Sequence, residues 1–181
     1  MLATISDAEP ASDERLIHLA AGGDRAAFGE LYQRYARMVH AILLARVPPA
    51  DAEDLVQDVF MAAMKRLKEL RTTAAFRGWL GAIARRRAID YFRDGRRRAE
   101  FPFGTEHQVP ATDSGDRALV TLDLVRRLPE AYRETLIMRL VEGMTGPEIA
   151  RQTGLTPDSV RVNLCRGMKM LRELWKGDAH A

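Results

Sequence analysis

Thr145-Gly-Pro-Glu148-Ile-Ala-Arg-Gln-Thr-Gly154-Leu-Thr156-Pro-Asp158-Ser-Val160 is the stretch that decides the fold of this chain, because it contains two explicit helix starts. Thr145 to Glu148 has the S/T-x-x-E form of a capping box. Thr156 to Asp158 supplies an N-cap, a proline in the first turn and an acid near the helix N-terminus. The spacing predicts a short helix that ends at Gly154, followed by a longer helix.

The residues around these two starts are typical of a helix-turn-helix. Ala150 offers a small side chain where two helices would cross, and Gly154 can adopt the positive φ of a tight turn. Apolar contacts between the two helices are expected from Ile149, Leu155, Val160 and Leu164. In DNA-binding motifs of this kind, the first turns of the second helix enter the major groove.

The second helix also has the charge of a DNA-binding surface. Residues 155–176 contain five basic and two acidic side chains, a local charge of +3. Basic side chains can hold phosphates, while side chains in the first turns can contact base edges. The candidate DNA-contacting residues are Thr156, Ser159, Arg161, Val162, Asn163 and Arg166. The alternative is a helical hairpin in a bundle, whose outer face is only solvated.

Upstream, apolar residues recur at spacings of three and four, which predicts helices over residues 13–21, 24–47, 50–70 and 74 to about 95. In the second half of the chain the same pattern resumes, and Pro129 marks the start of a further helix over 130–142. From Gly95 to Gly115 the chain has two prolines, three glycines and no helical periodicity, which is typical of a linker. The sequence therefore predicts an all-α fold with two small helical domains joined by a flexible linker. We call residues 13–95 the first block and residues 116–176 the second block, with the linker over 96–115.

An arginine-rich segment ends the first block. Residues 85–98 hold seven arginines and two aspartates, a local charge of +5 that suits a polyanion. The alternative is a solvated helix end, because the macrodipole also favours cations near a helix C-terminus. Tyr91 and Phe92 would suit stacking on unpaired bases, whereas Phe76 and Trp79 are assigned mainly to the core.

Residues 51–58 carry four acids and no basic residue. Asp51, Asp54 and Asp58 fall on one helical face. A metal site would need histidine partners at useful spacing or the glycine-bearing loop of a calcium site, so no metal is expected. Two interpretations stay open at this point: a docking surface for a basic partner, and the ordinary preference of helix N-termini for acids.

The composition excludes several classes of protein. The chain has 181 residues, 46% apolar and 29% charged, with a net charge of +3, which is typical of a globular protein. Cys165 is the only cysteine, which excludes intrachain disulfides and cysteine-cluster zinc sites and fits a reducing compartment. The longest apolar run, Val59 to Met64, is far too short to span a bilayer. We expect a cytoplasmic protein without membrane insertion.

The sequence shows no constellation of catalytic residues. The four histidines are far apart along the chain, no Ser or Cys lies in a nucleophile turn, and no glycine-rich loop could cradle a phosphate. We therefore expect no catalytic residue, no cofactor and no enzymatic activity, and a small helical enzyme is the least favoured class.

Three further motifs precede the helix-turn-helix: Asp51-Ala-Glu-Asp-Leu-Val-Gln-Asp-Val-Phe60, Phe76-Arg-Gly-Trp-Leu-Gly-Ala-Ile-Ala-Arg-Arg-Arg-Ala-Ile-Asp90 and Leu128-Pro-Glu-Ala-Tyr-Arg-Glu-Thr-Leu136. In this order they resemble a bacterial extracytoplasmic-function (group IV) sigma factor, a subunit of RNA polymerase. The resemblance extends from about Asp13 to Trp175. It implies that the first block is sigma region two and the second is region four, which carries the helix-turn-helix.

The resemblance implies a partner for each charged segment. Core RNA polymerase would bind the face that contains Asp51, Asp54, Leu55, Gln57 and Asp58. The minus-ten element of promoter DNA would be recognised and opened by the segment before Phe76 together with Arg77, Arg85, Arg86, Asp90 and Arg93. The candidates at residues 156–166 would read the minus-thirty-five element. The family also implies an anti-sigma factor that masks these surfaces. Arg86 and Val162-Asn163 differ from the commoner residues of the family, so the promoter sequence does not transfer.

The linker length implies that the two blocks cannot easily reach both promoter elements alone. Sites about two turns of DNA apart are separated by ~70 Å, whereas the 21 residues from Gly95 to Gly115, as a flexible linker, have a root-mean-square reach of ~25 Å. We therefore expect tight promoter binding only with core polymerase. The alternative function is a free-standing helix-turn-helix transcriptional regulator, which would bind a palindromic operator alone and use the first block to dimerise or to sense a signal.

Overall fold

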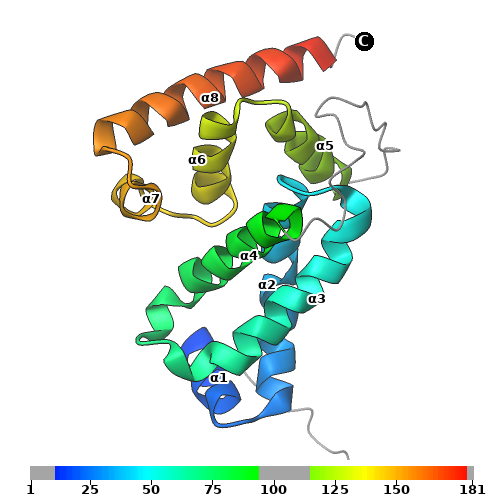
Figure 1. The fold of residues 1–181 in the computed structure, drawn as a ribbon, viewed down its shortest axis with the longest axis vertical. Coiled ribbons are helices and arrows are strands. Elements are labelled where there is room, and N and C mark those ends of the chain that lie inside the picture. Colours follow the sequence, from blue (N-terminus) through cyan, green and yellow to red (C-terminus); the bar gives the residue numbers. More distant parts are fainter. Residues whose placement is uncertain (1–10, 94–114, 179–181) are drawn as a thin grey trace, which may run out of the picture.

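A computed structural model describes residues 11–93 and 115–178 (Figure 1). The first block contains α1 (Asp13–Ala21), α2 (Arg25–Leu44), α3 (Pro49–Arg66), the 3-10 turns η1 (Leu67–Glu69) and η2 (Thr73–Ala75), and α4 (Phe76–Arg93). The second contains α5 (Gly115–Arg126), α6 (Glu130–Leu140), α7 (Gly146–Thr153) and α8 (Pro157–Asp178). The described residues contain no strand, which confirms the all-α prediction. Except for Gly115, the predicted linker lies outside the described residues.

Several helices begin where a short polar side chain accepts hydrogen bonds from the first backbone N–H groups, or where a proline, which has no N–H to satisfy, lies in the first turn. The Asp24 carboxylate accepts hydrogen bonds from the backbone N–H groups of Ala26 (2.8 Å) and Ala27 (3.1 Å) at the start of α2. Pro49 occupies the first turn of α3, and Thr156 Oγ1 accepts the backbone N–H of Ser159 (3.2 Å) at the start of α8. These starts are local in sequence, which is why the residue pattern predicts them.

Helices α1 to α4 pack around one apolar core. Phe76 is only 2% exposed, and its ring meets the edge of the Tyr35 ring at a centroid distance of 5.1 Å. Trp79 packs beside it, with its ring centroid 5.9 Å from that of Phe76. The core side chains of this block that are almost completely buried include Leu31, Val39, Ile42, Leu43, Val59 and Leu80.

The second block is built on α8, which crosses α6 at Gly167. A Cβ at this position would lie 3.0 Å from Leu136 Cδ1 and 3.2 Å from Tyr132 Cβ, so the absence of a side chain at Gly167 lets the two helices pack closely. At the other end of α8, Gly154 has φ +73° and its N–H bonds to the carbonyl of Ala150 at 2.9 Å. The helix-turn-helix therefore forms at the predicted turn, over a small cluster of Met138, Ile149, Ala150 and Val160.

Four helix ends differ from the periodicity-based prediction. The helix expected to reach residue 47 ends at Leu44. The helix expected to reach residue 70 ends at Arg66, and the next begins at Phe76 rather than at residue 74, because residues 67–75 contain two 3-10 turns. The helix expected over 130–142 ends at Leu140. Gly143 adopts φ +71°, and the N–H groups of Glu142 and Met144 bond back to carbonyls of the last helical turns. Glu142 therefore lies in the turn between α6 and α7.

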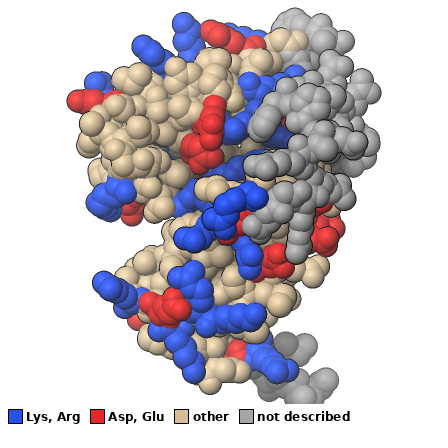
Figure 2. Space-filling model, in the orientation of Figure 1, with Lys and Arg blue, Asp and Glu red and all other residues tan. Residues whose placement is uncertain are grey.

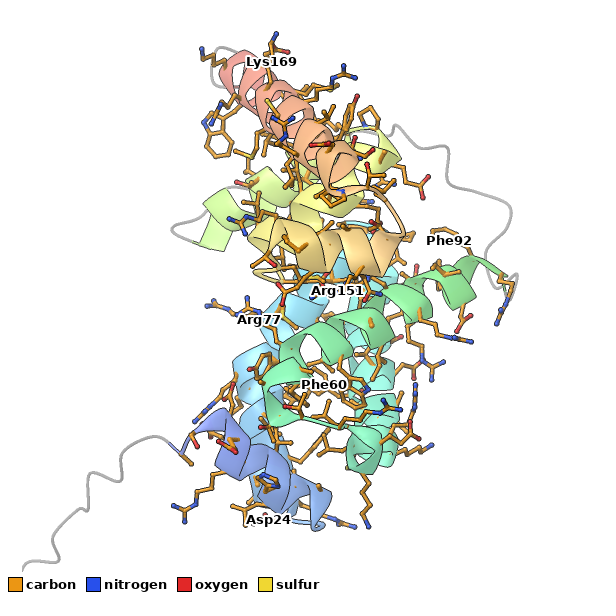
Figure 3. The ribbon with its side chains drawn as sticks, turned by 90° about the vertical axis from the view of Figure 1, so that its left-hand side faces the viewer. Asp24, Phe60, Arg77, Phe92, Arg151 and Lys169 are labelled. Atoms are coloured by element: carbon orange, nitrogen blue, oxygen red, sulfur yellow. The ribbon has the colours of Figure 1, made fainter. Side chains whose placement is uncertain are left out.

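The second block rests against one end of the first, with the turn between α6 and α7 next to α4 (Figures 1 and 3). The buried apolar cluster of the first block continues into Leu124, Leu136 and Ile137 of the second. Arg46, which follows α2, forms an ion pair with Glu134 of α6. None of the described helices combines the length and the apolar character that crossing a membrane requires.

Candidate nucleic-acid and protein interfaces

The first turns of α8 present the predicted minus-thirty-five residues together. Thr156 Oγ1 lies 2.8 Å from Ser159 Oγ, which fixes the start of the helix. The Arg161 side chain is 80% exposed and lies 3.6 Å from the Asp158 carboxylate, an exposed pair that contributes little to stability. Val162 and Arg166 are exposed, and Asn163 is half-buried. The structure thus gathers the six residues at the N-terminal end of α8.

Helix α4 carries all five predicted minus-ten residues but divides them into two groups. In the first group, the side chains of Arg86 and Arg93 are 76% and 68% exposed, and they lie 3.9 Å and 2.8 Å from the Asp90 carboxylate. Ile89 and Phe92, on the same part of α4, are 65% and 44% exposed. Cations next to an exposed aromatic ring suit contact with unpaired DNA.

In the second group, Arg77 and Arg85 face the turn between α6 and α7. Arg85 is buried, and its Nη1 donates to the carboxylate of Glu142, whose side chain is fully buried. Arg77 Nη2 donates to the carbonyl of Val141 at 2.7 Å, at the boundary of the two blocks (Figure 3). The five residues therefore do not form one open surface in this conformation. The sequence could not show this, because the partners lie 57 and 64 residues further along the chain.

Figure 2 shows how charge is distributed over one face of the molecule. Blue Lys and Arg side chains gather where the two blocks meet, with Asp and Glu side chains interleaved among them. Arg77 and Arg85 belong to this boundary, as does Arg46. Of the cations expected to meet the minus-ten strand, Arg85 is therefore buried between the blocks and Arg77 has a partner there while remaining exposed, whereas Arg86 and Arg93 are open to solvent.

Helix α3 presents an acidic face to solvent. Asp54, Gln57 and Asp58 are exposed, whereas Leu55 is half-buried and packs against the core. Asp51 is half-buried and accepts a hydrogen bond from the Tyr91 hydroxyl at 2.9 Å, which links α3 to α4. Asp51 and Leu55 thus have structural contacts of their own, and Asp54, Gln57 and Asp58 define the part of the predicted docking face that is exposed.

Two methionines extend this acidic face beyond the predicted residues. Met61 and Met64 are 55% and 52% exposed, and they follow Asp58 along α3. Exposed methionines beside charged residues are typical of protein-binding surfaces. The sequence carried a signal for them, because they lie outside the buried stripe of the same helix, which is formed by Ala52, Val56, Val59 and Ala63.

A hollow of about 280 Å³ lies between α1 and the segment that precedes α4. Ile17 and Leu67 give it apolar walls, and Arg71, Thr72 and Thr73 line it as well. This combination suits an unpaired base with its phosphate. Among the described residues, no group of His, Cys, Asp and Glu is placed to hold a metal ion.

A polar network attaches α1 to α2 near this hollow. The Asp13 carboxylate accepts hydrogen bonds from the Tyr35 hydroxyl and from Arg34 Nη1, the latter at 2.7 Å. Burial, followed by the hydrogen bond to Asp13, raises the pKa of Tyr35 to about 12. Burial opposes ionisation of Asp13, but the two hydrogen bonds and the Arg34 charge lower the pKa of this carboxyl below its usual range. The network is therefore intact at neutral pH.

Two family models match this chain. The family model for Sigma-70 region 2 matches residues 31–98, and that for Sigma-70, region 4 matches residues 119–171. The RNA polymerase sigma factor NccH of Alcaligenes xylosoxydans xylosoxydans is 32% identical over 179 residues, covering 92% of this chain and 96% of the relative. The ECF RNA polymerase sigma factor BldN of Streptomyces coelicolor is 30% identical over 184 residues, covering 96% and 70%.

Solved structures resemble this chain over most of its length. CnrH in complex with the cytosolic domain of CnrY has a TM-score of 0.65 and 27% identity, covering 92% of this chain and 98% of CnrH. The sigma factor RpoE of Bartonella quintana, in complex with the anti-sigma factor NepR, has a TM-score of 0.64 at 20% identity, covering 82% of this chain and 96% of RpoE. The second likeness concerns the fold alone.

Proposed function

Because the chain belongs to the sigma-70 family, as an extracytoplasmic-function sigma factor, we propose how its two blocks act in promoter-specific transcription initiation. The chain binds core RNA polymerase, directs it to promoters and helps to open their minus-ten region. The observation that carries this function is the match of region two and region four to the two helical blocks, in that order. A free-standing regulator could use the first block to dimerise or to sense a signal, but neither role calls for a first block that matches sigma region two.

The second block provides the upstream contact with the promoter. The N-terminal end of α8 enters the major groove of the minus-thirty-five element, where Ser159, Arg161, Val162 and Asn163 meet base edges. Arg166 lies further along the helix and holds a phosphate. The support for this assignment is the exposure of Arg161 and Arg166 at the end of α8 that the helix-turn-helix presents.

The first block provides the downstream contact. The exposed end of α4, with Arg86, Asp90 and Arg93, lies along the non-paired strand of the minus-ten element, and the hollow before α4 receives one unpaired base. Captured bases shift the melting equilibrium because unstacking costs of a few kcal/mol per base are offset by stacking and phosphate contacts. Opening DNA in this way requires no catalytic residue. Sigma factors as a class are not enzymes, and we propose no catalytic role for this chain.

Two protein partners complete the proposal. Core polymerase docks on the acidic face of α3 through a basic surface, with Met61 and Met64 as apolar contacts at its edge. An anti-sigma factor covers these surfaces when transcription is off, as the complexes of CnrH with CnrY and of RpoE with NepR suggest. We propose the cytoplasm as the place of action, since polymerase and promoter are there.

In vitro transcription tests the function directly. Core RNA polymerase is incubated with a library of promoter fragments, with and without this chain, and the transcripts are sequenced. We expect transcripts from a restricted set of start sites only when the chain is present. Binding to a palindromic operator in the absence of polymerase, without new transcripts, would favour the free-standing regulator instead.

A further inference from the structure

One face of α4 is shaped to receive an anion. Arg77, Gly81 and Arg85 follow one another at intervals of four residues and share this face. Gly81 is buried, and a Cβ there would lie 2.4 Å from Glu142 Oε2 and 3.0 Å from Glu142 Cδ. The missing side chain at Gly81 thus makes the space in which the carboxylate lies. We call Arg77, Gly81 and Arg85 the anion seat.

Glu142 fills the anion seat incompletely. Its carboxylate accepts a hydrogen bond from Arg85 Nη1. Arg85 Nη2 and Glu142 Oε1 are also buried, but neither has a hydrogen-bond partner among the described residues. Buried charged atoms without partners cost free energy. An arginine can hold a phosphate through two parallel N–H bonds, so Arg85 has donor capacity that Glu142 leaves unused.

The remaining contacts between the two blocks, which we call the joint, hold the blocks together and still allow them to separate. Leu124, Leu136 and Ile137 continue the apolar cluster across the boundary and favour closure without fixing its geometry. The geometry is set by polar contacts, from Arg77 to the Val141 carbonyl and from Arg46 to Glu134. Ion pairs that lose their hydration contribute little net stability, because desolvation offsets much of the attraction. Water can replace these partners when the blocks separate.

We propose that the anion seat binds either Glu142 or a phosphate of promoter DNA, so that region four must leave α4 before the minus-ten strand can bind there. This inference rests on the proposed function, which places α4 along that strand, and on the family resemblance, which adds Arg77 and Arg85 to the minus-ten contacts. Both ligands are anions that need the same guanidinium group of Arg85, and the Glu142 side chain occupies the space above Gly81. The unbound chain therefore blocks part of its own DNA-binding surface. Since the two events are linked, opening and DNA binding favour each other by the same factor.

Two substitutions open the joint by different physical routes. Gly81→Ala fills the space of the carboxylate, while the alanine itself favours the helical conformation of α4. Gly78→Ala is its matched control, because a Cβ one turn earlier meets nothing within 4 Å. Glu142→Gln removes the charge and leaves Arg85 buried without a counter-ion, which is strongly unfavourable in the closed form. Glu173→Gln, at an exposed position of α8, is its control.

Distance measurements on the full-length chain test the opening. Spin labels are attached to native Cys165, which is exposed on α8, and to a cysteine introduced by Gln33→Cys at an exposed position of α2. We expect Gly81→Ala and Glu142→Gln to shift the distance distribution to longer values, and both controls to keep the wild-type distribution. Circular dichroism verifies that helix content is unchanged. Wild-type distributions in both test variants would overturn the proposal.

A fluorescent single-stranded oligonucleotide of 12 nucleotides and mixed sequence tests the competition. If the open form makes up ~10% of the unbound chain, Glu142→Gln binds this probe about tenfold more tightly than wild type and Glu173→Gln, because it opens the joint and leaves the seat empty. Gly81→Ala serves the distance measurement alone, because its methyl group also occupies the space that a phosphate would use. The oligonucleotide should also lengthen the distance in the wild-type chain. Equal affinities of Glu142→Gln, Glu173→Gln and wild type would overturn the shared seat. If the wild-type chain directs no transcription with core polymerase, the proposed function is wrong. If the wild-type chain directs transcription but the proteins bind the oligonucleotide with equal affinity, only this inference is wrong.

Discussion

At the scale of single residues, the environment of a charged side chain decides what the charge does. Arg161 and Arg85 have the same chemistry, but the Arg161 side chain is 80% exposed and that of Arg85 is 9% exposed. An exposed guanidinium is available to a ligand and contributes little to the fold. A buried one depends on its counter-ion, so its replacement affects the arrangement of the two blocks as well as any ligand.

Asp58 belongs to the exposed class and allows a test of the acidic face. We expect Asp58→Lys to weaken binding to core polymerase by at least about tenfold, because a cation would then face a basic partner. Thermal unfolding should be unchanged, since Asp58 is exposed and forms no described ion pair. The measurement is a pull-down or titration with core enzyme, with Glu173→Lys as the control for the change in net charge. Unaltered affinity would contradict the docking role of this face.

Arg161 allows a corresponding test of the upstream contact. If the Arg161 guanidinium contacts a base edge, Arg161→Ala should lower the free-energy preference for the correct minus-thirty-five sequence over a mismatched one by about 1–3 kcal/mol. Transcription from a premelted template that lacks this element should be unaffected. The comparison of the two templates separates recognition from melting, and an equal loss on both would show that Arg161 acts elsewhere.

The sequence could predict the exposure of those residues whose surroundings depend only on neighbouring positions in the chain. Ser159 and Arg161 lie close to the helix start that exposes them, and Asp54 and Asp58 lie one turn apart on one helix. Arg85 is different, because its burial depends on Glu142 in another block. No local pattern distinguishes it from Arg86, which is exposed on the same helix.

At the scale of elements, the turns at the helix ends determine how neighbouring helices are placed. Gly154, with φ +73°, sets the angle between α7 and α8, and Gly143, with φ +71°, ends α6 and turns Glu142 toward α4. The turn at Gly154 was predictable because it lies between two capped helix starts. The turn at Gly143 was missed because apolar periodicity continues through Val141 and masks the end of the helix.

Two glycines provide opposite outcomes for the same substitution. We expect Gly154→Ala to lower the free energy of unfolding by about 1 kcal/mol, because alanine is strained at positive φ although the space for its Cβ is open. Gly29→Ala, in the interior of α2 with equally open space, should raise it by 0.5–1 kcal/mol, on the order expected for a helix interior. Urea unfolding followed by circular dichroism measures both. A stabilising Gly154→Ala would show that the turn can change its backbone conformation.

At the scale of the whole molecule, the distribution of charge matters more than its sum. The net charge of +3 conceals an acidic face on α3, a basic start of α8 and arginines that point into the joint between the blocks. With Arg85 buried against Glu142, the unbound chain should attract DNA less strongly than it would with this guanidinium open. Assembly with a larger partner that holds the blocks apart would expose this guanidinium.

We therefore expect the isolated chain to protect neither promoter element in a footprinting experiment at physiological salt. Together with core polymerase, it should protect both elements on the same promoter. The 21 residues from Gly95 to Gly115, with a root-mean-square reach of ~25 Å as a flexible linker, cannot readily join sites ~70 Å apart without a third body. Protection of both elements by the isolated chain, as strong as with polymerase, would contradict this expectation.

The contact between Gly81 and Glu142 also limits which residues relatives of this chain can have at these two positions. A side chain at position 81 and a long acid at position 142 cannot share the same space in the closed arrangement. Relatives that close in this way should therefore pair glycine at the first position with glutamate at the second. Those with a larger residue at the first should carry a shorter or uncharged residue at the second. Covariation of these two positions in a family alignment would indicate that relatives keep the same contact between the two blocks.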